Sequence, residues 1–416
     1  MGCAWPLICQ VSPWLFIRKK KAFASRPGRQ KSVVPSDRAD RMLPLPGDIL
    51  EKCTNCGACQ VQCAFLTRYG TPKEIFTALS LAKQHALAFE CSLCGLCRAV
   101  CPEDIDPGGA FLNLRRDAVI KKQVDLSKYS TILGYEKKGT SALFSCYALP
   151  QGCDTIFFPG CTLPGTRPKT TWALFETLKS QVPNLGIVLD CCTKPSHDLG
   201  RETYFQSMFG EMLGVLQTHG ITRVWLACPN CYKVFKTYAP KMTIETVYEV
   251  MDRSSLPCKM SYGSQTFEHT QLVVHDPCPM RDDLPVQEAV RSLLTGMDLA
   301  VGKMAFEKKK TLCCGEGGAV GFVDPELARI WTEKRKKTAG ARPIVTYCAG
   351  CTGFLNRAVP TFHILDLLFF LNKNATGQPR VAKAPFTYFH RLALKRKIKK
   401  THRGVVIRAR HYRPVE

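Results

Sequence analysis

Eighteen of the 23 cysteines in this 416-residue chain fall into two repeated spacings, and this pattern limits the fold more than any other feature. The first 17 residues contain two prolines, a glutamine and a serine and lack a basic start, so they make a poor secretory signal. Outside a secretory context, so many cysteines indicate metal ligation rather than disulfide bonds.

The first spacing is a run of four cysteines that occurs twice: Cys53, Cys56, Cys59 and Cys63, then Cys91, Cys94, Cys97 and Cys101. Three closely spaced thiolates suit a cubane iron–sulfur cluster, and Gly57 and Gly95 allow the tight backbone. In two-cluster ferredoxins the fourth cysteine of each run binds the other cluster. We therefore predict one [4Fe-4S] cubane on Cys53, Cys56, Cys59 and Cys101, and a second on Cys91, Cys94, Cys97 and Cys63. Two structural zinc sites are the alternative, which this spacing disfavours.

The segment between the two runs has a helical pattern. Thr71, Pro72 and Glu74 form a capping box with proline at the first helical position, and apolar residues recur at helical spacing over 75–89. The sequence therefore predicts that the two runs lie in a helical domain.

The second spacing is one cysteine, an adjacent pair and a Cys-x2-Cys motif. It comprises Cys161, Cys191, Cys192, Cys228 and Cys231, and recurs 117 to 122 residues later at Cys278, Cys313, Cys314, Cys348 and Cys351. The similar offsets of all five cysteines indicate an internal duplication. Adjacent cysteines seldom both reach one metal in a tetrahedral zinc site, so two polynuclear centres are expected.

Short apolar runs precede these cysteines. They lie at 155–158, 186–189, 223–226, 272–274 and 344–347, and helical patterns at 171–179 and 204–218 lie between them. Alternating strands and helices predict parallel α/β sheets, whose ligands gather at the carboxyl ends of the strands. The cysteines follow the strands at that position.

These motifs are similar to those of the iron–sulfur oxidoreductases with paired cysteine-rich "CCG" domains. Residues 43–372 most resemble the fused catalytic subunit of heterodisulfide reductase, in which a helical two-cubane ferredoxin precedes two CCG domains. The iron–sulfur subunits of glycolate oxidase, of anaerobic glycerol-3-phosphate dehydrogenase and of lactate-utilisation complexes are related chains. The resemblance implies that each complete CCG set holds a noncubane four-iron cluster through its five cysteines, giving one or two clusters beyond the cubanes.

The two CCG sets differ after the adjacent cysteines. The second set keeps the family's glycine at Gly315, whereas the first set has Thr193. A β-branched residue does not easily adopt a positive φ, so we expect a different turn or a different cluster environment at the first centre.

The expected architecture is an α+β multidomain chain. We predict a basic N-terminal extension (1–42), a helical ferredoxin domain (43–125), a linker (126–152), a first α/β CCG domain (153–262), a second (263–372) and a basic C-terminal tail (373–416). The extension holds nine Lys and Arg against two Asp, and the tail thirteen against one Glu. A solvated helical tail is the main expectation; nucleic acid is not expected as a partner, because no recognisable nucleic-acid module is present.

The resemblance implies an oxygen-sensitive oxidoreductase. Two cubanes would relay single electrons to the CCG clusters, held in part by Cys191, Cys192, Cys313 and Cys314, which reduce a bound disulfide. The alternative is an electron-transfer subunit of a flavin-dependent hydroxy-acid or glycerol-3-phosphate dehydrogenase complex. The implied partner is a b-type cytochrome membrane subunit or a flavoprotein. A cytoplasmic location is expected, with peripheral association with the inner face of the cell membrane as an option.

Other residues near the cysteines are weaker candidates. Glu316 is a candidate proton shuttle or a turn cap, and His197 and His275 are candidate proton donors or hydrogen-bonded structural residues. Lys194, Lys233 and Arg281 would tune the potential, bind an anion or simply face solvent. The apolar segment 363–371 is expected to be the last helix of the second CCG domain, or a docking face. The remaining thiols are expected to be free, with Cys153 as a candidate neighbour of the first centre: Cys3, Cys9, Cys146, Cys153 and Cys258.

Overall fold

The computed structural model describes residues 44–254, 271–370, 381–402, 404–412 and 414. The basic N-terminal extension, with Cys3 and Cys9, lies outside the described residues, and so does Cys258. Within the described ranges, no helix has the length and apolar character that a membrane crossing requires.

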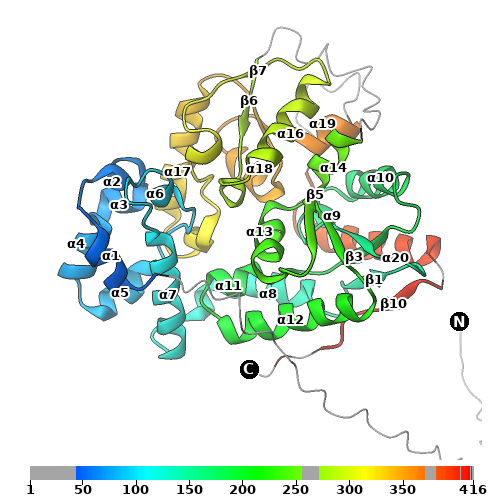
Figure 1. The fold of residues 1–416 in the computed structure, drawn as a ribbon, viewed down its shortest axis with the longest axis horizontal. Helices are drawn as coiled ribbons and strands as arrows, with labels where there is room; N and C mark the ends of the chain where they lie inside the picture. Colours follow the sequence, from blue (N-terminus) through cyan, green and yellow to red (C-terminus); the bar gives the residue numbers. More distant parts are fainter. Residues whose placement is uncertain (1–43, 255–270, 371–380, 403, 413, 415–416) are drawn as a thin grey trace, which may run out of the picture. The chain divides into compact units, whose positions relative to one another are not determined.

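The N-terminal described part consists of short helices, as predicted (Figure 1). They are α1 (Pro46–Lys52), α2 (Ala58–Gln62), α3 (Ala64–Tyr69), α4 (Pro72–Ala78), α5 (Leu81–Ala88), α6 (Leu96–Ala99) and α7 (Pro107–Ile120), followed by η1 (Leu126–Tyr129) and α8 (Ser130–Gly139). The capping box is present: the Thr71 Oγ1 atom accepts from the Glu74 N–H, and the Glu74 carboxylate accepts from the Thr71 N–H. The single helix expected over 75–89 is two helices, because Leu79 and Ser80 are extended.

Two sheets follow, with strand orders β10-β1-β3-β2-β4-β5 and β7-β6-β8-β9. The strands are β1 (Cys146–Ala148), β2 (Thr155–Phe158), β3 (Gly186–Leu189), β4 (Arg223–Leu226), β5 (Thr243–Thr246), β6 (Leu272–His275), β7 (Val301–Gly302), β8 (Ile344–Thr346), β9 (Thr361–His363) and β10 (Val406–Arg408). The series β3-β2-β4-β5 and the whole second sheet are parallel. The series β3-β2-β4-β5 corresponds strand for strand to β7-β6-β8-β9, as a duplication produces, and all five predicted strands are present.

Helices connect these strands. They are α9 (Leu163–Thr166), α10 (Pro168–Lys179), α11 (Lys194–Asp198), α12 (Glu202–Thr218), α13 (Pro229–Tyr238) and α14 (Val247–Arg253) in the first repeat, then η2 (Cys278–Met280), α16 (Leu284–Thr295), η3 (Lys308–Lys310), η4 (Gly317–Phe322), α17 (Pro325–Ala339), α18 (Ala349–Leu355) and α19 (Ile364–Phe370) in the second. The two repeats share one apolar core, in which α14 packs against α16.

The predicted helix at 363–371 is α19, as far as the described residues reach. Its side chains Leu365, Leu367 and Leu368 are buried, and it packs against α10 of the first repeat as well as against β9. The alternative expectation of a docking face is therefore wrong for these buried side chains.

The C-terminal residues differ from the solvated tail that the charge pattern predicts. Residues Phe386–Thr401 form helix α20, which packs on α9 and β1 through buried Leu394 and Ile398 (Figure 1). The strand β10 then pairs antiparallel with β1, extending the first sheet. The apolar residues of α20 form a buried face, which the basic composition of the segment does not reveal. The lysines are compatible with this packing, because a lysine stem can cover apolar surface while its charge reaches a polar partner.

Candidate metal centres

The cysteines of the first run lie around one pocket with the last cysteine of the second run. Cys53, Cys56, Cys59 and Cys101 all line this pocket. Gly57 begins α2 with φ at 75°, a left-handed conformation that glycine adopts without a steric penalty. Burial, and then the neighbouring thiols, raise the pKa of Cys59 to about 11.

The other four cysteines of the helical part form a second group. Cys63 lies between α2 and α3, and its pKa is raised by burial and then by Cys94 and Cys91. The pKa of Cys97 is raised by burial and then by Cys63 and Cys91. The structure thus brings each fourth cysteine to the triplet of the other run.

The first five-cysteine set lies at the carboxyl ends of β2, β3 and β4. This is the point where the strand order reverses, and ligands of parallel sheets bind at such a point. The Cys231 thiol donates to the Cys192 sulfur at 3.3 Å. A Cβ atom on Gly160 would lie 3.0 Å from the Cys228 Cβ and 3.2 Å from the Cys231 sulfur, so the backbone at Gly160 forms one wall of the sulfur cluster.

The second set has the same relation to β6, β7 and β8. The Gly315 N–H donates to the Cys313 sulfur at 3.3 Å, and the Cys351 N–H donates to the Cys348 sulfur at 3.5 Å. In both sets the second member of the adjacent pair has a lowered pKa, because neighbouring thiols donate hydrogen bonds to it. The pKa of Cys192 is lowered to about 6 by Cys191 and Cys231, and that of Cys314 is lowered well below its ordinary value by Cys313 and Cys351.

Each set therefore gathers five sulfur atoms, with no disulfide among the described cysteines. Soft thiolate donors select iron–sulfur clusters, copper(I) or zinc. A set of five cysteines has one ligand more than a tetrahedral zinc site binds, and two of the five are adjacent in the chain. The residues present fit an iron–sulfur cluster in each set.

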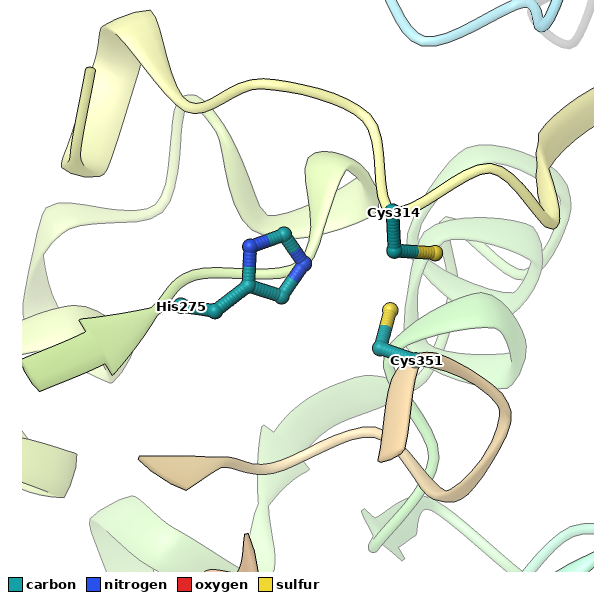
Figure 2. Close-up of side chains that lie close together, drawn as sticks. All are labelled: His275, Cys314 and Cys351. Carbon is teal, nitrogen blue, oxygen red and sulfur yellow. The ribbon is translucent and has the colours of Figure 1, made fainter. Parts of the chain in front are cut away.

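His275 belongs to the second set only. It ends β6, and one of its ring nitrogens, the Cys314 sulfur and the Cys351 sulfur lie within 4.8 Å of one another (Figure 2). The imidazole is buried, and burial lowers its pKa, so that the ring is neutral. The corresponding end of β2 is Phe158, so the first set has no imidazole at this position.

The second CCG set contacts the helical part of the chain directly. A hydrogen bond from the Cys313 thiol is the main reason that the pKa of Cys94 falls to about 6. Beside this contact, Arg281 donates to the Cys94 carbonyl oxygen at 3.2 and 3.1 Å and to the Thr311 carbonyl oxygen at 2.7 Å. The arginine expected near solvent is thus buried at a domain contact.

The two CCG sets also face each other. The Tyr248 hydroxyl lies 3.1 Å from the carbonyl oxygens of Ala227 and Tyr347, which precede Cys228 and Cys348. The pKa of Cys348 is lowered by a hydrogen bond from Cys351 but raised overall by burial, then by Glu316 and by Cys228 of the first set. One tyrosine side chain therefore links equivalent points of the two repeats.

Two ionisable side chains lie close to the cysteines of the sets. Lys194 interacts electrostatically with Cys192 of the first set and Cys278 of the second, and its ammonium group donates to the Asp198 carboxylate at 2.6 Å. Glu316 lies within reach of Cys348 and Cys351, and burial, followed by the charge on Cys314, raises its pKa to about 8.

The remaining candidates lie in structural positions or in solvent. His197 forms hydrogen bonds with the Asp198 carboxylate and the Tyr238 hydroxyl, both at 2.9 Å, as a structural histidine does. Lys233 is exposed. Cys153 is not near the first centre, because it donates to the Thr155 carbonyl oxygen at the start of β2, whereas Cys161 follows the other end of that strand. Cys146 lies buried in β1.

The turns after the two adjacent cysteine pairs give a prediction. Thr193 adopts φ 55° and ψ 24° despite its branched Cβ, and Gly315 has φ 103°. A Cβ on Gly315 would lie 2.6 Å from the Ala328 carbonyl oxygen, so Gly315→Ala is expected to cost about 3 kcal/mol of stability and to release the iron of the second set. Thr193→Gly should keep all the iron, because it relieves about 1 kcal/mol of left-handed strain. Iron analysis and denaturant unfolding check both variants; full iron in Gly315→Ala would contradict the prediction.

Comparisons with known proteins match the same regions. The family described as a 4Fe-4S dicluster domain matches residues 49–105. The family described as a cysteine-rich domain, the CCG domain, matches residues 155–236 and 272–356. The chain is 24% identical to one of the subunits of the fumarate reductase (CoM/CoB) of Methanothermobacter marburgensis over 73% of this chain and 66% of that protein, and so spans just under two thirds of its length.

The chain is also similar to two further redox proteins. The chain is 21% identical to one of the subunits of the dihydromethanophenazine:CoB–CoM heterodisulfide reductase of Methanosarcina mazei, over 70% of this chain and 84% of that protein. It is 25% identical to the EtfAB:quinone oxidoreductase of Syntrophomonas wolfei over 36% of this chain and 20% of that protein. All three names describe redox proteins.

Proposed function

We propose that this chain, which belongs to the family of iron–sulfur oxidoreductases that join a 4Fe-4S dicluster domain to two CCG domains, reduces a disulfide between its two CCG sets. The observation that carries the proposal is the approach of the two five-cysteine sets to each other through Tyr248 and Lys194. A disulfide needs two electrons, and two one-electron centres, one in each set, would supply that number.

The dicluster domain carries two cubane [4Fe-4S] clusters, and the CCG domains add further iron–sulfur clusters. We assign the cubanes to the two groups of four cysteines that the structure brings together, and one cluster to each CCG set through its five cysteines. When bound, such clusters accept and donate electrons one at a time. The domain limits 43–125, 153–262 and 263–372 are part of this proposal, with residues 381–412 added to the first CCG domain.

The reaction consumes two electrons and two protons and yields two thiols from one disulfide. A charged side chain between the sets fits this reaction. Lys194 presents a positive charge beside Cys192 and Cys278, where negative charge develops as the sulfur–sulfur bond breaks. The Cys94–Cys313 contact joins the dicluster domain to the second CCG set, and electrons from clusters held by the dicluster domain would pass at this contact.

The two reductase relatives are named as parts of larger complexes, so the chain works with partner proteins. We propose that the electron donor is a b-type cytochrome or a flavoprotein, and that the chain works in the cytoplasm, peripheral to the inner face of the membrane where the donor is the cytochrome. A second candidate function is electron transfer for a flavin dehydrogenase, without substrate chemistry in this chain. The similarity to the EtfAB:quinone oxidoreductase favours this candidate.

A viologen assay separates the two functions. Anaerobically purified protein is mixed with reduced methyl viologen and, one at a time, with anionic, neutral and cationic disulfides. Disulfide reduction predicts oxidation of two viologens for each disulfide consumed, with two thiols formed. A panel in which no disulfide oxidises viologen, with a flavin dehydrogenase co-purifying, would overturn the proposal in favour of electron transfer.

A further inference from the structure

Helix α20 lies beyond the residues that match the CCG domain, yet it borders the first centre. It packs on α9, the short helix that begins two residues after Cys161. The His390 ring contacts the Gly165 carbonyl oxygen at 3.0 Å, and the next residue, Arg391, is 3% exposed. The C-terminal segment thus places a cation in the interior of the first repeat.

The Arg391 guanidinium group is held by aromatic rings and lacks a full set of polar partners. Its central carbon lies 5.4 Å from the ring centre of Tyr135 and 5.0 Å from that of Phe144. The Nη1 atom has no hydrogen-bond partner among the described residues. A buried cation costs several kcal/mol unless negative charge lies nearby, so an anionic neighbour is expected.

The nearest cysteines of the first set lie on the other side of a glycine. A Cβ atom on Gly139 would be 3.2 Å from the Cys191 Cβ and 3.4 Å from the Arg391 Nη2. Because glycine has no side chain, Cys191 and Arg391 approach each other from opposite sides of this position. The Tyr135 hydroxyl, whose ring Arg391 covers, donates to the Cys161 carbonyl oxygen at 2.9 Å.

We propose that Arg391 is a positioning residue whose positive charge balances the first CCG centre and raises its reduction potential, which makes α20 part of the redox site. The reduced centre carries one more negative charge than the oxidised centre, so a buried cation at this distance favours reduction. This inference rests on the proposed function, because it requires that the first CCG set holds a cluster.

The test is an anaerobic redox titration of the full chain followed by electron paramagnetic resonance. The first-centre signal is the one that Cys192→Ser removes. In Arg391→Met, the ratio of reduced to oxidised first centre at the native midpoint potential is expected to fall at least tenfold, or about 59 mV for one electron. Arg391→Lys keeps the charge and should stay within threefold of the native ratio. The matched control is Arg396→Met, which removes an exposed cation from the same helix and should leave the ratio unchanged.

Iron content makes the remaining outcomes decisive. Loss of first-centre iron in Arg391→Met but not in Arg391→Lys would support the inference, because it shows that the charge is needed. An unchanged ratio in a fully loaded Arg391→Met protein would overturn it, and so would loss of the iron in both variants, which indicates packing alone. A native chain without any signal that Cys192→Ser removes would overturn the proposed function, and this inference with it.

Discussion

Replacing Cys314 by serine is expected to lower disulfide-dependent viologen oxidation by at least about 100-fold and to remove about four irons. The Cys314 sulfur lies at the middle of the second set, where Cys313 and Cys351 donate hydrogen bonds to it and His275 lies beside it. A serine hydroxyl is a poor ligand for iron in a sulfur-rich site, because soft thiolates hold such clusters.

The matched control is Cys153→Ser, the same change at a buried thiol that belongs to neither set. Cys153 donates to the Thr155 carbonyl oxygen at 3.1 Å, and a serine hydroxyl can make the same hydrogen bond. This variant should keep the native iron content and a rate within about twofold of native, since a replaced hydrogen bond of this kind changes stability little. A Cys314→Ser protein with full iron and native rate would remove the second set from the account.

Arg115→Met is expected to destabilise the chain by about 4 kcal/mol or more. The Arg115 side chain is fully buried and donates to four carbonyl oxygens, at distances from 2.6 to 2.9 Å. These oxygens belong to the helical part and to both CCG repeats: Ala88, Cys91, Asp198 and Gly318. Methionine fills a similar volume but leaves all four acceptors without this donor.

The neighbouring arginine supplies the control. Arg116 pairs with Glu202 at 2.7 Å near the surface, so Arg116→Met should cost no more than about 1 kcal/mol. Denaturant unfolding of the two anaerobic proteins, followed by circular dichroism and by cluster absorbance, measures the difference. In Arg115→Met the cluster absorbance should be lost at a lower denaturant concentration than in Arg116→Met. Equal midpoints for the two variants would show that Arg115 does not join the domains as we infer.

The sequence was sufficient to predict the two sheets and the grouping of strands with cysteines, because both depend on local patterns. Short apolar runs report buried parallel strands, and a cysteine just after such a run lies at a carboxyl end. Thr193 is a partial exception. Its branched side chain argues for a different turn, but the structure keeps a left-handed residue at this position.

Contacts between distant parts of the chain could not be predicted from such local patterns. Arg115, Arg281 and Arg391 are cations that a sequence places on the surface by default, and each is buried by segments far away in the chain. Tyr248 lies at the contact of the two repeats without any motif around it. The basic composition of the C-terminal residues likewise conceals the spacing of Leu394 and Ile398, which buries α20 beside the first centre.

The central claim is that eighteen cysteines hold four iron–sulfur clusters, two in the helical part and one in each CCG set. Iron and acid-labile sulfide analysis of the anaerobically purified chain tests it most directly. Four four-iron clusters predict about sixteen irons and a similar amount of sulfide for each chain. About eight irons, enough for the two cubanes alone, would contradict the claim and leave the two CCG sets without clusters.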